Sequence, residues 1–185
     1  RFMIYVLVKG AAIGLLYAYI SSAPFIIQDH FHFSAIAFGA IIGANAIAIA
    51  LGSMAAVRFK ILKQAIVAGI VGMFVFAIAD AIVFLTHPSI LWYELFSVPM
   101  LFFSGMIYSG SNTLAMEAGN SDAGTASAIL SIVKYAFAGI AAPLVGIGII
   151  FHATAWVFIA YSTLTLIIGY FAYRLTPMAD MIRKD

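Results

Sequence analysis

Long apolar stretches separated by short polar breaks run along the whole chain. They lie at residues 2–27, 35–57, 61–85, 90–116, 124–151 and 155–175. Each stretch is long enough for a helix across the hydrocarbon layer of a bilayer, which takes roughly 20 apolar residues. Strands of a membrane barrel would instead alternate apolar and polar positions. The pattern predicts an all-α membrane protein, with six transmembrane helices in one bundle over residues 1–185 and no soluble domain.

Composition places the chain in lipid. Of the 185 residues, 65% are hydrophobic and 9% are charged, which is too little charge to cover a water-soluble exterior. The chain has no cysteine, so disulfides and thiolate metal sites are excluded. The net charge of +2 gives no nucleic-acid footprint.

The positive residues predict how the helices are oriented. With six spans, most of them fall on one side of the membrane: Arg1, Arg58, Lys60, Lys63, Arg174, Arg183 and Lys184. The opposite turns contain no Lys or Arg. Because positive charge is retained on the cytoplasmic side, both termini of this multi-pass protein are expected in the cytoplasm.

Ionisable residues within the spans are the first candidates for function, since burying a charge in a membrane is costly. Lys134 lies ten residues after Gly124, about 15 Å into its helix. An ammonium at that depth must face a polar cavity, pair with an acid or lose its proton. Lys9 lies two turns into the first span, where reaching back to the interface and binding a ligand are both open.

The acidic residues lie nearer the other surface. Asp80, late in the third span, is expected to mark the outer water boundary, because its side chain can reach the interface. Glu94, early in the fourth span, is left open between a boundary residue and a site for substrate or protons.

Three polar or aromatic residues are further candidates for binding. Asn45 lies midway along the second span, where a hydrogen bond to a neighbouring helix is the commoner outcome. Tyr17 and Tyr19 would stack on an aromatic ligand, although interfacial belts use the same residues.

Small residues and prolines predict packing and bending. Gly39 and Gly43 form a GxxxG pattern, which is typical of closely packed membrane helices. Pro24 and Pro99 interrupt the first and fourth spans, as hinges or as static kinks.

Enzyme signatures are not found. The histidines at 30 and 32 have a weak spacing for metal, no HExxH is present, and no glycine-rich phosphate loop precedes a Lys-Ser or Lys-Thr pair. Neither covalent catalysis nor a bound cofactor or metal is expected.

Three stretches carry a family resemblance. They are residues 17–25 (Tyr-Ala-Tyr-Ile-Ser-Ser-Ala-Pro-Phe), 38–45 (Phe-Gly-Ala-Ile-Ile-Gly-Ala-Asn) and 123–128 (Ala-Gly-Thr-Ala-Ser-Ala). In order and spacing, the chain resembles the C-terminal half of a major facilitator superfamily transporter, in particular the Bcr/CflA-type drug:proton antiporters.

Two more segments fit this resemblance. Gly139, Pro143 and Gly146 are similar to the Gly-Pro antiporter motif that such proteins carry in the symmetry-related helix of the other half. The segment that ends at Arg58 lies where the superfamily has a cytoplasmic loop motif of glycine and basic residues. The acidic residue expected in that motif is missing, which weakens its role as a gate latch.

The resemblance implies twelve spans in two halves, each a 3+3 inverted repeat beside a central substrate cavity. This chain would supply spans seven to twelve, and its start at Arg1 favours a fragment. The other half would be on the same chain, on a separate chain, or a second copy.

The implied function is secondary active transport in a bacterial inner membrane, with proton-coupled efflux of a small molecule. Lys9 and Lys134 favour an anionic or zwitterionic metabolite, such as a siderophore, over a purely cationic drug. A non-transporting six-helix scaffold or assembly subunit is the alternative.

Overall fold

The computed structural model describes residues 1–119 and 122–175. Within them lie α1 (Phe2–Pro24), η1 (Phe25–His30), α2 (Ala35–Val57), α3 (Leu62–Thr86), α4 (Ile90–Ala118), α5 (Ala123–Leu144) and α6 (Ile150–Leu175). All six α-helices are long and apolar enough to span a membrane, and no strand occurs in this part of the chain. The predicted fold class is confirmed: this is an all-α, multi-pass membrane protein.

Local capping fixes where two helices begin. The backbone N–H of Ala37 donates to Ser34 Oγ at 3.2 Å, so Ser34 is the N-cap of α2, which begins at residue 35 as the sequence predicted. Asp122 caps α5 in the same way, accepting from the Thr125 hydroxyl at 2.6 Å and from its N–H at 3.1 Å. These bonds lower the pKa of Asp122.

The predicted boundary between the last two helices is wrong. Residues 152–154, which include a His and a Thr, were expected to separate them, but the break lies at residues 145–149. Pro143 removes a backbone donor near the end of α5, and Gly148 adopts a left-handed conformation with φ of 83°. Thr154 is buried within α6. Single polar residues do not end a packed helix.

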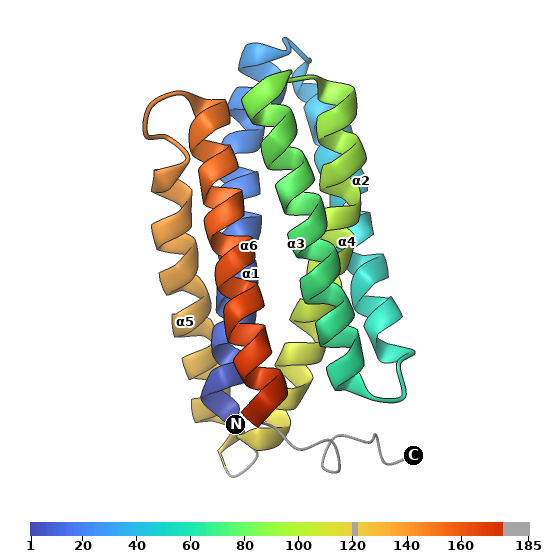
Figure 1. The fold of residues 1–185 in the computed structure, drawn as a ribbon, viewed down its shortest axis with the longest axis vertical. Helices are drawn as coiled ribbons and strands as arrows, with labels where there is room; N and C mark the ends of the chain where they lie inside the picture. Colours follow the sequence, from blue (N-terminus) through green and yellow to red (C-terminus); the bar gives the residue numbers. More distant parts are fainter. Residues whose placement is uncertain (120–121, 176–185) are drawn as a thin grey trace.

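The helices form two layers. Figure 1 shows α3 and α6 in front of α4 and α1, with α2 and α5 at the two flanks. The packed pairs are α3 with α4 and α6, α1 with α4, α5 and α6, and α2 with α4. Because α3 and α6 cover one side, the other side of α1 and α4 lies between α2 and α5.

The second three helices repeat the first three. Each begins 88 residues after its counterpart: Ile90 follows Phe2, Ala123 follows Ala35, and Ile150 follows Leu62 at that interval. The contacts between helices follow the same symmetry. The pair α1 and α5 corresponds to the pair α4 and α2, and the pair α3 and α4 corresponds to the pair α6 and α1. Counterpart helices run in opposite directions across the bundle (Figure 1). This is a 3+3 inverted arrangement, consistent with one half of a major facilitator fold.

A close helix crossing joins α2 to α4. A Cβ on Gly52 would collide with the backbone carbonyl of Phe102, and a Cβ on Gly105 would collide with that of Ile49. The Ser53 hydroxyl donates to the Gly105 carbonyl at 3.1 Å across the same crossing. Glycine is required on both sides of this contact, because only its missing side chain lets the backbones approach.

The GxxxG prediction is wrong for contacts within this chain. A Cβ on Gly39 or Gly43 would meet nothing within 4 Å. The sequence spacing indicates a small-residue face correctly, but it does not say whether another helix of the same chain covers it. Here that face of α2 is left open.

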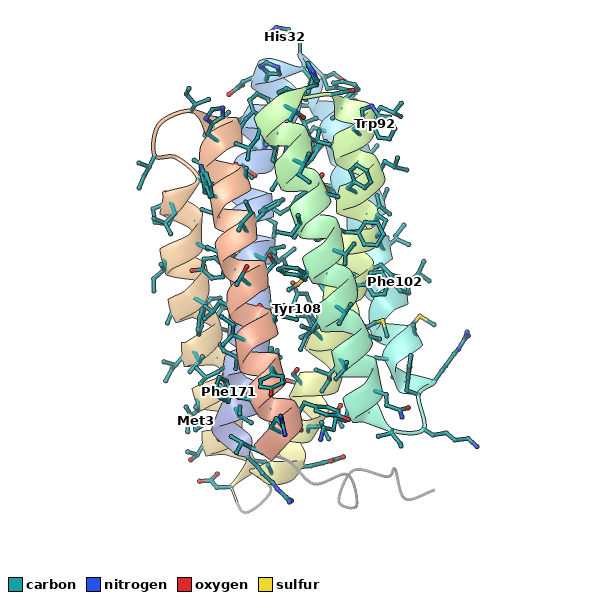
Figure 2. The ribbon with its side chains drawn as sticks, in the orientation of Figure 1. Met3, His32, Trp92, Phe102, Tyr108 and Phe171 are labelled. Atoms are coloured by element: carbon teal, nitrogen blue, oxygen red, sulfur yellow. The ribbon has the colours of Figure 1, made fainter. Side chains whose placement is uncertain are left out.

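Positive residues gather at one end of the bundle. Arg1, Arg58, Lys60, Lys63 and Arg174 lie at the chain start, in the α2–α3 turn and at the end of α6, which Figure 1 places together. Figure 2 shows Met3 and Phe171 toward this end, His32 and Trp92 at the other, and Tyr108 between them. Arg183 and Lys184 lie outside the described residues. We call the positive end the basic end.

One of these positive residues is buried rather than exposed. Lys63 is buried in the first turn of α3, where Nζ donates to the Tyr173 carbonyl at 2.7 Å and lies over the Tyr173 ring. A cation at the carboxyl end of a neighbouring helix is favourable, because the last carbonyls of α6 are partly negative.

Candidate functional site

The candidate site lies on the side of α1 and α4 opposite α3 and α6, between α2 and α5. We call this side the open face. Only 17% of an apolar 18-residue segment is buried within the bundle in each of the flanking helices α2 and α5, against 61% in the first span, Phe2–His30. Gly39, Gly43 and Gly139 contact no other part of the described chain through a Cβ position. The open face is therefore where a further helix, lipid or water would have access.

Two lysines from different helices approach one another on this face. Lys9 Nζ on α1 donates to Asn112 Oδ1 on α4 at 2.7 Å, so its side chain extends across to α4. Lys134 on α5 is close enough for the two positive charges to interact. We call Lys9, Asn112 and Lys134 the lysine site.

Lys134 occupies the middle of α5, eleven residues after Ala123. It is half-exposed, and its ammonium lies 4.2 Å from the centroid of the adjacent Tyr135 ring. Within the described residues it has no acidic partner. Ser131 and Ser127 precede it by one and two turns on the same helix face, which continues the polar surface. This ammonium is neither sealed in the core nor neutralised by a carboxylate.

A second polar group lies further from the basic end. Asn45 of α2 is buried, and its Nδ2 donates to the Tyr19 hydroxyl of α1 at 2.5 Å and to Glu94 Oε2 of α4 at 2.8 Å. One amide thus joins three helices, and the expectation that Asn45 bonds a neighbouring helix is confirmed. The second Glu94 oxygen, Oε1, is buried without a hydrogen-bond partner, as is Asn45 Oδ1.

Asp80 belongs to the same group, and the expectation that it marks the water boundary is wrong. The residue is 0% exposed. Its Oδ2 accepts from the Ser97 hydroxyl of α4 at 2.8 Å, and its Oδ1 has no hydrogen-bond partner. The helix turns this side chain toward α4, whereas depth along α3 alone had suggested the interface. We call Tyr19, Asn45, Asp80, Tyr93, Glu94 and Ser97 the acid cluster.

The two candidate tyrosines differ in exposure, because residues two apart lie on opposite sides of a helix. Tyr19 is 2% exposed, and its ring lies 6.1 Å from that of Tyr93. In this conformation it offers no ring surface to a stacked ligand. Tyr17 is half-buried, so it is the one that retains accessible ring surface.

None of the predicted hinge and gate residues is a member of the lysine site or of the acid cluster. Pro24 is the last residue of α1, where the helix widens into the π-helical η1, and α4 continues through Pro99. Neither proline breaks its span. Gly139 and Pro143 are exposed on α5, and Gly146 lines a hollow beside η1 at the end remote from the basic residues. Arg58 is the exposed C-cap of α2.

Sequence reasoning missed Asn112, Tyr93 and Ser97. Each is a polar position within the apolar fourth span, and Ser97 follows Glu94 by one helical turn, which puts both on one face. That spacing is the signal available in the sequence, although only the fold shows that Asp80 reaches the same place. No group of three His, Asp or Glu residues that would suit a metal ion occurs in the described part of the chain.

Comparison with known proteins gives one relative of known superfamily. No protein-family model matches the chain, and no solved structure matches it. The chain is 30% identical over 179 residues to the uncharacterized MFS-type transporter YdgK of Bacillus subtilis (strain 168). The match covers 93% of this chain and 43% of that protein, so the chain spans less than half the length of the relative. Over nearly its whole length, the chain is thus similar to part of an MFS-type transporter.

Proposed function

We propose that this chain is one half of a secondary active transporter, and that its open face lines the path of a small molecule. The similarity to an MFS-type transporter and the 3+3 arrangement support this proposal. The open face would then lie against the other half of the transporter. A positive-inside orientation places the basic end, with both chain ends, in the cytoplasm.

The observation that carries the proposal is the lysine site. Two like charges approach one another at the depth of the bilayer, without an acidic partner among the described residues. Such an arrangement is unfavourable in lipid and becomes favourable beside water or a bound anion. Both charges are thus oriented for a ligand that brings its own negative charge.

The substrate class follows from this charge. An anionic or zwitterionic metabolite would bind between Lys9 and Lys134, with Asn112 fixing the Lys9 ammonium. Its direction of movement is export in exchange for protons, as in the Bcr/CflA-type antiporters of bacterial inner membranes that the sequence resembles. Tyr17 would supply a ring surface for an unsaturated part of the substrate.

Replacing Lys134 by Gln tests the proposal. In vesicles containing the protein, transport of carboxylate-bearing compounds, siderophores included, is expected to fall about ten- to hundredfold in kcat/KM. This corresponds to the roughly 1.5–3 kcal/mol of a hydrogen bond to a charged group. Transport of cationic dyes is not expected to fall with it.

Arg174→Gln is the matched control, because it also removes one positive charge, but at the exposed end of α6. It should leave transport unchanged. Unaltered transport of acidic compounds by Lys134→Gln would remove the lysine site from the mechanism. Absence of transport of any compound by the wild-type protein would favour the non-transporting scaffold.

A further inference from the structure

The acid cluster contains two carboxyl groups and no positive charge. Titratable groups that face Glu94 are Tyr19 from α1, Asp80 from α3 and Tyr93 from α4 itself, while α2 contributes the neutral Asn45. No Lys, Arg or His of the described chain contacts either carboxyl group. Two ionised carboxylates here would repel each other without a counter-charge in a low-dielectric interior. The cluster is therefore more favourable when it holds protons.

The two acids differ in their access to water. Asp80 is 0% exposed, and Ser97 holds one of its oxygens from within the core. Glu94 is half-exposed toward the open face, with Oε2 held by Asn45 and Oε1 buried without a partner. Proton exchange at Glu94 therefore needs only a local movement of its side chain and of the Asn45 bond, whereas exchange at Asp80 requires the helices to separate.

The cluster is also separate from the lysine site. Tyr19 follows Lys9 by ten residues on α1, which is about 15 Å along the helix axis. A proton on Glu94 and an anion at the lysines would therefore occupy different depths of the same face.

We propose that Glu94 is a proton-exchange site and that Asp80 remains protonated beneath it. Glu94 takes its proton from water at the open face and returns it there, so that its carboxylate and carboxylic acid forms alternate. On protonation, the bond from Asn45 loses its charge-assisted character and weakens. Since Asn45 is the residue of α2 in this cluster, proton binding loosens the link between α2, α1 and α4. Use of this proton in transport rests on the proposed function, but proton binding itself does not.

Infrared difference spectroscopy on the purified protein, titrated from neutral to alkaline pH so that exposed carboxyl groups such as Glu117 are already ionised, tests the proton site directly. The carbonyl stretch of protonated carboxylic acids is expected to contain a part that disappears as pH rises and a part that persists. Glu94→Gln should abolish the first part, and Asp80→Asn should abolish the second while leaving the first.

Glu117→Gln is the matched control. Glu117 lies on the same helix as Glu94 but is exposed near the basic end, so its replacement should leave the persistent band and the buried titration unchanged. A wild-type protein with no protonated carboxylic acid at neutral pH would overturn the proposal, and so would a titrating band that survives in Glu94→Gln. The wild-type spectrum decides the first point even if a variant does not fold.

Transport measurements separate this proposal from the proposed function. In vesicles, Glu94→Gln should lose accumulation driven by a proton gradient at least tenfold, while exchange of labelled for unlabelled substrate without a gradient persists. If neither the wild-type protein nor any variant transports a substrate, the infrared titration still tests proton binding at Glu94 independently. If gradient-driven accumulation survives in Glu94→Gln, this residue does not couple protons to transport.

Discussion

At the scale of single residues, Asn45 links three helices through its side-chain amide. It is a buried amide whose two hydrogen bonds reach two other helices, and one of them holds Glu94. Depth along a span predicted that Asn45 and Glu94 would matter, but not that they would touch, because contact depends on the rotation of each helix about its axis. Asp80 shows the same limit: its depth suggested water, and its rotation places it in the core.

Replacing Asn45 by Leu is expected to lower the stability of the folded protein by about 1–2 kcal/mol. Interhelical hydrogen bonds in membranes are each worth about 0.6 kcal/mol, with a maximum near 1.7, and two are lost here. Thermal unfolding in detergent measures the effect. Ala46→Leu, at the next and exposed position, is the control and should change little; equal stability of both variants would contradict the structural role of Asn45.

At the scale of helices, the α2–α4 crossing depends on glycine at two reciprocal positions. Gly52 lies against the backbone at Phe102, and Gly105 lies against the backbone at Ile49. The GxxxG spacing pointed to Gly39 and Gly43 instead. Such spacing predicts that a helix has a face of small residues, but not which other helix packs against that face. The start of α2 was predicted to the residue, and a side-chain cap defines it, whereas the break between α5 and α6 contains a left-handed glycine, Gly148, rather than a run of polar residues.

Gly105→Val should prevent α2 and α4 from approaching, because the added side chain collides with backbone that cannot move aside. We expect the folded yield in membranes to fall severalfold, with earlier thermal unfolding in what remains. Gly43→Val, on the same pair of helices but at an open position, is the comparison. It should fold normally in this chain, and an equally damaging Gly43→Val would place another helix over the open face.

At the scale of the whole molecule, the chain builds one face that it does not cover. Hydrophobic length predicted the number of helices and their order, and the positive residues predicted that both described chain ends share one end of the bundle. Neither the hydrophobic length nor the positive residues predict which sides of the helices remain open, because lipid-facing and partner-facing positions are both apolar. The open face shows itself through its polar exceptions, Lys9, Asn112 and Lys134, which lie together only in the folded chain.

The central claim is that the open face borders water while the opposite side borders lipid. It can be tested by single-cysteine labelling, since the chain contains no cysteine of its own. Ser131→Cys and Asn112→Cys lie on the open face, and Val71→Cys on the exposed side of α3 lies at a similar depth. With a charged, water-soluble maleimide applied to intact membranes, we predict rapid labelling of the first two and none of the third. Equal protection of all three positions would contradict an aqueous path beside Lys134.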